Sequence, residues 1–191
     1  MLKDEDFYLP GTPYTKEEIR AVLLKKLNLK GEEVVYEVGS GSGTITVELA
    51  LSLPRGKVYA FEKDLQRLTV IKENLRRFSV RNVVLIPQAL PCDLSAYPPP
   101  DLVVIGGSSS LREVLKQVGA CLKNGGVLAG LAVTLESLAI YQEFFQNSSF
   151  TDFDGISIAV TRLKKAGSYH ILNAQNPVFI FTGRKKEENN G

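Results

Sequence analysis

Residues 37–43 have the types and spacing that most clearly suggest chemistry. They read Glu37-Val38-Gly39-Ser40-Gly41-Ser42-Gly43 and end an apolar run typical of a buried strand. Residues without a Cβ atom let the backbone turn tightly and let a ligand lie against the main chain. A dinucleotide fingerprint would need glycine in place of Thr44, and a P-loop would need a Gly-Lys-Ser/Thr sequence that this segment lacks. The segment is therefore expected to cradle a ligand that has no pyrophosphate.

Glu62 ends the next predicted strand, nineteen residues after Gly43. A carboxylate at that position can accept hydrogen bonds from the 2′- and 3′-hydroxyl groups of a ribose. Together, the glycine loop and Glu62 predict an adenosine site in which the loop faces an amino-acid tail. The alternative for the loop alone, a tight connection that binds nothing, is disfavoured by this carboxylate.

Alternating helix and strand patterns surround these residues. Helices are predicted over 15–27, 43–53, 64–78, 109–122 and 135–147, the first from the capping-box pattern Thr15-Lys16-Glu17-Glu18, and strands over 33–38, 57–62, 82–87, 101–106 and 127–133. Two more β-rich stretches, 153–162 and 178–182, flank a predicted loop over 164–176 and are expected to pair antiparallel. The fold class is α/β: a Rossmann-like, seven-stranded, mostly parallel sheet with an antiparallel last strand and helices on both faces. One domain is expected over 1–184, followed by a polar tail over 185–191.

Composition limits the kinds of partner that this chain is expected to bind. The chain has 191 residues and a formal net charge of +2, which is too balanced for a protein whose affinity depends on a phosphate backbone, so nucleic-acid binding is not supported. Its two cysteines, Cys92 and Cys121, have no metal-site spacing, so neither a metal site nor a disulfide framework is expected. We find no signal-peptide pattern and no apolar run long enough for a bilayer, and therefore expect a cytoplasmic protein without a membrane anchor.

The glycine loop and Glu62 together resemble the class I S-adenosylmethionine-dependent methyltransferases, and the predicted sheet is similar to theirs. Longer segments are similar to a narrower family, the decarboxylating precorrin-6B carbon-15 methyltransferases of cobalamin biosynthesis. These segments are GTPYTKEEIRAVLLKKLNL, PDLVVIGGSSSLREVL, LKNGGVLAGLAVTLES and SYHILNAQNPVFIFTGRK, and they span nearly the whole chain. The chain departs from the family pattern at Glu37, where Asp is more usual, at Tyr14, where Met is common, and at Gly130-Leu131, which replaces an Asn-like start.

The resemblance implies S-adenosylmethionine as the cofactor, a cobalt-precorrin as the substrate and a homotetrameric assembly. The implied reaction methylates carbon 15 and releases the acetate carboxyl at carbon 12 as carbon dioxide. Cofactor contacts are expected from Thr15, Gly39, Ser40, Gly41, Ser42, Gly43, Glu62 and Ala89. Glu37 either orients the loop by accepting backbone hydrogen bonds or meets the ammonium group of the cofactor. No catalytic residue is assigned, because methyl transfer from a sulfonium is downhill and alignment can suffice.

Substrate contacts are expected from Gly106, Gly107, Thr134, Arg162, Lys164 and His170. A precorrin presents many carboxylates, and Arg162, Lys164 and His170 are cationic or protonatable. Each of these residues also has a plain structural alternative: a solvated charged loop for the basic residues and a structural role for the single histidine. Helix capping is the corresponding alternative for Thr15.

Other functions remain open from the sequence alone. A class I methyltransferase acting on RNA, protein or another small molecule would share the fold. A binding module without catalysis would keep the fold but would not need the glycine loop and Glu62. A nicotinamide-dependent oxidoreductase is disfavoured by Thr44.

Overall fold

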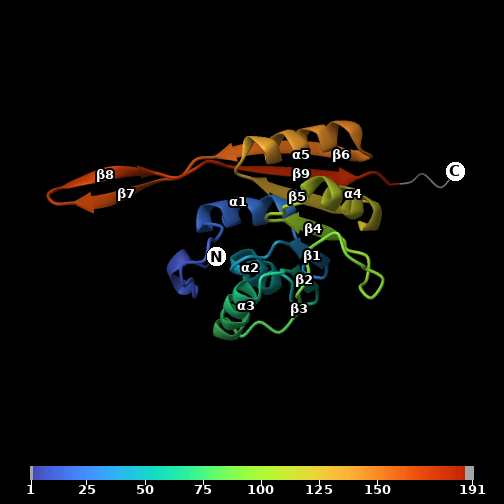
Figure 1. Ribbon diagram of the computed structural model, residues 1–191, viewed down its shortest axis with the longest axis horizontal. Coiled ribbons are helices and arrows are strands. Elements are labelled where there is room, and N and C mark those ends of the chain that lie inside the picture. The colour runs from blue at the N-terminus through green and yellow to red at the C-terminus, as the bar shows by residue number, and fades with distance from the viewer. Residues whose placement is uncertain (1, 188–191) are drawn as a thin grey trace.

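The computed structural model describes residues 2–187, apart from the side chain of residue 147. Its centre is a seven-stranded sheet in the order β3-β2-β1-β4-β5-β9-β6 (Figure 1). The strands are β1 (Val34–Val38), β2 (Lys57–Phe61), β3 (Val83–Ile86), β4 (Leu102–Ile105), β5 (Val127–Ala132), β6 (Phe150–Ile158) and β9 (Val178–Lys185). The pairs from β3 to β5 are parallel, and β9 runs antiparallel to both β5 and β6. This confirms the predicted α/β fold class and the antiparallel last strand.

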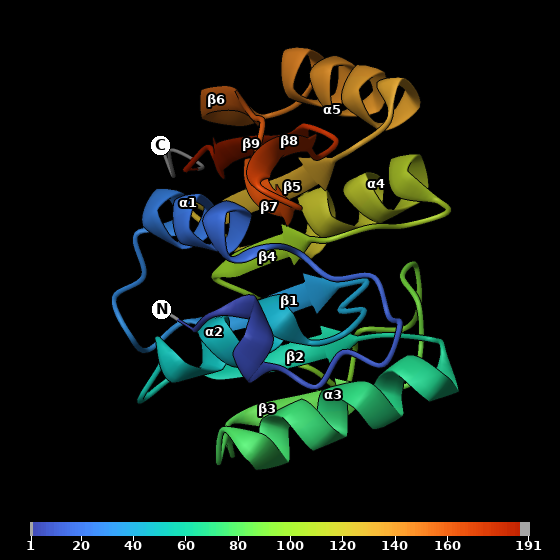
Figure 2. The same cartoon turned by 90° about the vertical axis from the view of Figure 1, so that its left-hand side faces the viewer.

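Helices cover both faces of the sheet, as Figure 2 shows. They are α1 (Glu17–Leu27), α2 (Thr44–Leu51), α3 (Leu65–Arg77), α4 (Leu111–Cys121) and α5 (Leu135–Asn147), together with a short 3-10 helix, η1 (Asp4–Asp6). Successive side chains of a strand point to opposite faces, so each strand contributes to two cores. In β1, Val35 packs in the core formed with α1 and α2, whereas Tyr36 packs in the core formed with α4 and α5. The helix α3 packs beside α2.

The first long helix begins later than predicted and is capped differently. It starts at Glu17 after Lys16, so the capping box expected from Thr15 is not formed. Instead, the Glu17 N–H donates to Oδ1 of Asp4 at 2.9 Å, and the Asp4 N–H donates to Oε2 of Glu17 at 2.8 Å. A residue of the 3-10 helix therefore satisfies a backbone donor that a helix leaves unpaired at its N-terminus.

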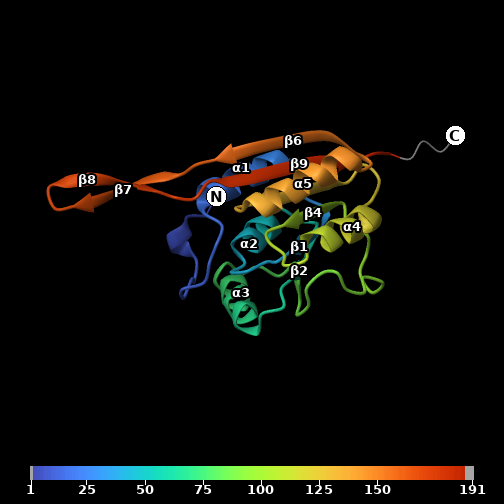
Figure 3. The ribbon, with the colours of Figure 1, turned by 45° about the horizontal axis from the view of Figure 1, so that its top comes forward.

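The region after α5 differs most from the prediction. The expected loop over 164–176 is instead a hairpin of β7 (Thr161–Ala166) and β8 (Tyr169–Ala174), which projects away from the body of the molecule (Figures 1 and 3). A two-residue turn joins its strands, and Gly167 takes a φ of 63° there, which glycine adopts without steric cost. We name the segment 161–174 the hairpin arm. The predicted strand over 153–162 was accordingly wrong at both ends.

The end of the chain also differs from the prediction. The strand β9 continues to Lys185, one residue into the segment predicted as a tail, because Arg184 pairs with Val127 of β5 and Lys185 pairs with Phe150 of β6. Residues 188–191 of the predicted tail lie outside the described residues.

Candidate active site at the carboxyl ends of the strands

The glycine loop lies between β1 and α2, and each of its three glycines has a positive φ: 72° at Gly39, 59° at Gly41 and 79° at Gly43. A Cβ atom on Gly39 would lie 2.1 Å from the carbonyl oxygen of Gly107, which follows β4. A Cβ atom on Gly41 would meet nothing nearer than 3.9 Å. Gly39 is therefore required by packing against the neighbouring loop, whereas the space at Gly41 is available to a ligand.

A cavity of about 310 Å³ opens above this loop. Its wall comes from the N-terminal segment, from the glycine loop and from the chain just after β4 and β5. The lining residues are Pro13, Tyr14, Thr15, Glu37, Gly39, Ser40, Gly41, Ser42, Thr44, Ile45, Arg67, Gly106, Gly107 and Val133. The carboxyl edge of a parallel sheet is where α/β proteins bind their ligands, and the sheet itself places the loops of several strands there.

Glu62 is buried at the end of β2 and holds the loop in place. Its Oε2 atom accepts a hydrogen bond from the Gly41 N–H at 2.9 Å, and its Oε1 atom accepts one from the Asp64 N–H at 3.0 Å. Each carboxylate oxygen has a second lone pair, which can accept a hydroxyl hydrogen bond. The backbone hydrogen bond that the sequence suggested for Glu37 is thus made by Glu62.

Glu37 is buried beneath the loop, and its carboxyl group accepts a hydrogen bond from the Thr46 hydroxyl of α2. Burial raises the pKa of Glu37 to about 8, although hydrogen bonds from Thr46 and Ser40 act in the opposite direction. At neutral pH the group therefore holds its proton until a cation approaches. It lines the cavity, so a bound cation can reach it.

The N-terminal segment is anchored over the loop by two fully buried side chains that the sequence did not single out. Arg20 donates from Nη1 to the carbonyl oxygen of Thr15 at 2.6 Å and to Asp4 at 2.7 Å, and from Nε to Glu48 at 3.2 Å. Arg20 lies next to the apolar positions of its helix, and nothing in that spacing indicates its partners. Thr15 therefore lines the cavity through a backbone position fixed by this arginine.

Asn74 of α3 is the second anchor. Its Oδ1 atom accepts from the Tyr8 N–H at 2.7 Å, and its Nδ2 atom donates to the Tyr8 carbonyl at 3.1 Å and to the Ser42 carbonyl at 2.9 Å. One side chain thus joins the N-terminal segment to the glycine loop.

The structure brings some of the expected substrate residues to the cavity and not others. Gly106 and Gly107 line it, but Thr134 caps α5 by accepting a hydrogen bond from the Ser137 N–H at 3.2 Å. Arg162 lies at the base of the hairpin arm, 3.2 Å from Asp4 and 3.0 Å from Glu18.

The other expected contacts lie away from the cavity. Lys164 and His170 are exposed on the hairpin arm. Ala89, expected at the adenine edge, is exposed after β3 and is not among the lining residues of the described chain.

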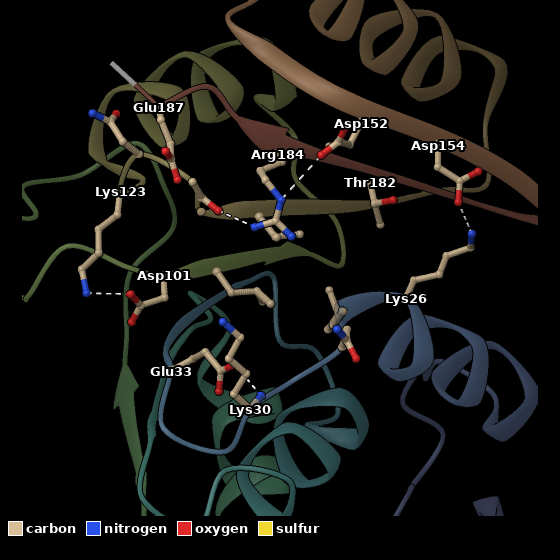
Figure 4. Close-up of a pocket in the computed structure, with 18 of the residues that line it drawn as sticks. Lys26, Lys30, Glu33, Asp101, Lys123, Asp152, Asp154, Thr182, Arg184 and Glu187 are labelled. Carbon is tan, nitrogen blue, oxygen red and sulfur yellow. Dashed lines mark hydrogen bonds and ion pairs between the residues drawn. The ribbon is translucent and has the colours of Figure 1, made fainter. Parts of the chain in front are cut away.

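A second, larger cavity of about 750 Å³ lies at the opposite edge of the sheet (Figure 4). Three of its four lining cations are already paired, as Figure 4 shows: Lys26 with Asp154, Lys123 with Asp101 at 2.7 Å, and Arg184 with Asp152 at 3.7 Å. Ion pairs of this kind leave little charge for a ligand. The amino ends of the parallel strands meet here, so we place the functional site at the other edge.

Neither a metal-binding cluster nor a membrane-spanning helix is found in the described part of the chain. Within residues 2–187, no group of three or more His, Cys, Asp or Glu side chains is arranged to hold a metal ion. None of the helices in this part of the chain is both long and apolar enough to cross a membrane.

The sheet order, the antiparallel β9 and the glycine loop beside Glu62 define a class I methyltransferase. The chain belongs to the precorrin methyltransferase family, because the model described as "Precorrin methyltransferase domain" matches residues 6–185. A relative from Pyrobaculum aerophilum, named as a probable cobalt-precorrin-6B C(15)-methyltransferase (decarboxylating), is 34% identical over 95% of this chain and 94% of its own length.

Solved structures agree with this membership. The precorrin-6y C5,15-methyltransferase of Geobacter metallireducens superposes with a TM-score of 0.89 at 34% identity and covers 96% of both chains. A precorrin 8w decarboxylase from Methanobacterium thermoautotrophicum superposes with a TM-score of 0.88 at 27% identity, over 96% of this chain and 99% of the other. The match therefore extends over nearly the whole of each protein, and the family model covers the segments that form the cavity.

Proposed function

We propose that this protein is an S-adenosylmethionine-dependent methyltransferase of corrin biosynthesis that methylates carbon 15 of cobalt-precorrin-6B and decarboxylates the acetate at carbon 12. The observation that carries the proposal is the full-length match to relatives named for this reaction, together with the cavity above the glycine loop. The alternative class I substrates, RNA, protein or another small molecule, have no comparable support.

S-Adenosylmethionine fits the residues that surround the cavity. The open space at Gly41 admits a ligand against the backbone. Glu62 is not among the lining residues of the described chain, but it is hydrogen-bonded to Gly41, which is, and the remaining lone pairs of its carboxylate suit the two ribose hydroxyl groups. Glu37 suits the ammonium group of the methionine part. Further proposed contacts to the cofactor come from Thr15, Ser40, Ser42 and the backbone near Ala89. When bound, the cofactor supplies an electrophilic methyl group.

In this reaction the protein aligns the methyl group with the attacking carbon and excludes water. The N-terminal segment, anchored by Arg20 and Asn74, covers the glycine loop, while Gly106 and Gly107 leave the backbone after β4 accessible. The attacking carbon belongs to an electron-rich conjugated macrocycle, so no side chain is assigned as a base. The same macrocycle can accept the electron pair of the carbon–carbon bond that breaks when carbon dioxide leaves.

We also propose that the protein is a cytoplasmic homotetramer. The hairpin arm supports an assembly, because it projects from the sheet and exposes Leu163, Leu172 and Tyr169. Within one protomer, Lys164 and His170 lie away from the cavity, so a substrate contact from them would need a neighbouring copy. The free cysteines Cys92 and Cys121 are consistent with a reducing compartment.

The test is a reaction of the purified protein with cobalt-precorrin-6B and S-adenosylmethionine carrying a ¹³C-labelled methyl group. The proposal predicts a ¹³C-labelled methyl group attached to carbon 15, detected by NMR. One carbon dioxide should be released for each S-adenosylhomocysteine formed. Methylation without carbon dioxide release would contradict the decarboxylating assignment. Methyl transfer to tRNA or protein in parallel incubations, with none to the precorrin, would overturn the proposed substrate.

A further inference from the structure

Apolar side chains are exposed in the cavity lining and at the starts of α3 and α5, and we call this region the rim. Tyr14 and Val133, which line the cavity, are 42% and 64% exposed, and Leu135 at the start of α5 is 80% exposed. Leu65, at the start of α3, is 73% exposed. A group of exposed apolar side chains next to a ligand site commonly marks a binding surface.

These side chains border a broad area of the sheet edge. Leu65 follows β2, whereas Val133 and Leu135 follow β5, and β1 and β4 lie between those strands. With neighbouring strands spaced by about 4.8 Å, three steps give a separation of about 14 Å between the two sides. The rim can therefore support a wide, flat ligand above the glycine loop.

Arg67 of α3 is the single cation among the lining residues of the described chain. Its side chain is 45% exposed, and its acidic neighbours are Glu62 at 3.9 Å and Asp64 at 3.8 Å. Both distances exceed that of a charge-assisted hydrogen bond, so these acids orient the guanidinium without taking up its donors. The planar guanidinium presents paired donors that match a carboxylate. Arg162, by contrast, already lies between two acids within 3.2 Å.

We propose that Arg67 binds a peripheral carboxylate of the tetrapyrrole while Tyr14, Val133 and Leu135 carry the apolar face of its macrocycle. This inference rests on the proposed function and assigns the substrate contacts of that same site. It places the substrate on the cavity side of the glycine loop, above the cofactor, where the reacting carbon can face the methyl group.

The test measures binding in a complex that cannot react. Cobalt-precorrin-6B is titrated into the protein saturated with S-adenosylhomocysteine, and binding is followed by the change in its absorbance. We expect Arg67→Gln to raise the Kd for the precorrin at least 10-fold, the change expected for a lost charged hydrogen bond, and Arg67→Lys to restore part of it. The matched control is Arg76→Gln, which removes the same charge from the same helix at a site paired with Glu73.

A separate variant tests the apolar side chains of the rim. Leu135→Ser should weaken precorrin binding, whereas Leu51→Ser, at a half-exposed leucine at the end of α2, should not. The Kd for S-adenosylhomocysteine should stay within about twofold in all these variants.

Three results distinguish the possible failures. If Arg67→Gln binds precorrin as Arg76→Gln does, Arg67 is not a substrate contact. If Arg67→Gln weakens S-adenosylhomocysteine by the same factor, Arg67 acts by positioning Glu62, and the inference is again overturned. If the wild-type protein binds neither molecule, the proposed function itself fails and the inference fails with it.

Discussion

Two buried carboxyl groups lie at the proposed cofactor site. Glu62 accepts two backbone hydrogen bonds and so fixes the loop, whereas Glu37 lies below the loop and is hydrogen-bonded by hydroxyl groups. Burial away from any cation favours the protonated form of Glu37.

The raised pKa of Glu37, about 8, predicts how stability depends on pH. Below the usual pKa of about 4.5, the side chain is protonated in both the folded and the unfolded states. Between pH 4.5 and 8 the unfolded chain loses this proton and the folded chain keeps it, so Glu37 lowers the free energy of unfolding as the pH rises. Glu37→Gln should remove that dependence.

The measurement is urea denaturation of both proteins at pH 5, 6.5 and 8 without ligand. The stability of Glu37→Gln relative to the wild type should rise with pH across this range. A constant difference across this range would show that Glu37 ionises normally in the folded state.

Sequence reasoning located two kinds of residue. These are glycines that allow unusual backbone conformations and a charged residue at the end of a strand. The positive φ angles of Gly39, Gly41 and Gly43 and the position of Glu62 agree with that reasoning. Arg20, Arg67 and Asn74 could not be found in this way. Asn74 and Arg20 have partners distant in the sequence, as with Asn74 and Tyr8, 66 residues apart, so only the assembled fold defines what they do. The acidic neighbours of Arg67 are close in the sequence, but its place in the cavity lining depends on the fold.

At the scale of elements, the prediction succeeded where hydrophobic periodicity reflects burial. The helix α5 has the predicted bounds, 135–147, and the five parallel strands lie within their predicted ranges. The hairpin arm was missed because neither of its strands buries a face, so its pattern has no apolar alternation against a core. The turn signal Gly167-Ser168 between two short β-prone runs could have indicated it.

Asn74 of α3 links the N-terminal segment to the glycine loop, and a substitution at this residue tests the link. Asn74→Asp keeps the size of the side chain and its acceptor for the Tyr8 N–H, but it removes the donor to Tyr8 and Ser42. We expect a loss of about 1–3 kcal/mol in unfolding free energy and an approximately 10-fold weaker Kd for S-adenosylhomocysteine, because the loop is no longer tied. Calorimetric titration and urea denaturation measure the two effects.

Asn82 provides the matched control. Its Nδ2 atom also donates to backbone carbonyls, those of Ala50 and Leu53, but at the far end of α2. Asn82→Asp should therefore lower stability by a similar amount and leave the Kd unchanged. Equal weakening of ligand binding in both variants would mean that Asn74 acts only through overall stability.

At the scale of the whole molecule, the hairpin arm is the feature that one protomer does not explain. An isolated two-stranded hairpin is marginally stable in water. Leu163 and Leu172 pair directly across the arm, so they share a face, and they are 69% and 74% exposed. Burial of that face against other copies would stabilise both the arm and the proposed tetramer.

The double variant Leu163→Ser/Leu172→Ser should therefore dissociate the assembly. We expect a wild-type mass of four chains by analytical ultracentrifugation and a mass of one or two chains for the variant, with the circular dichroism of the sheet retained. Leu51→Ser, outside the arm, should keep the wild-type mass. A monomeric wild type, or a tetrameric double variant, would contradict this role of the arm.

We propose above all that Glu62 and the glycine loop hold S-adenosylmethionine. It is tested most directly by calorimetric titration of S-adenosylmethionine and S-adenosylhomocysteine into cofactor-free wild type, Glu62→Gln and Asp64→Ala. Asp64 is the neighbouring acid, and it caps α3 instead of facing the loop. We predict micromolar binding by the wild type, a Kd at least 10-fold weaker in Glu62→Gln, and little change in Asp64→Ala. Absence of binding to folded wild type, or an unchanged Kd in Glu62→Gln, would contradict the claim.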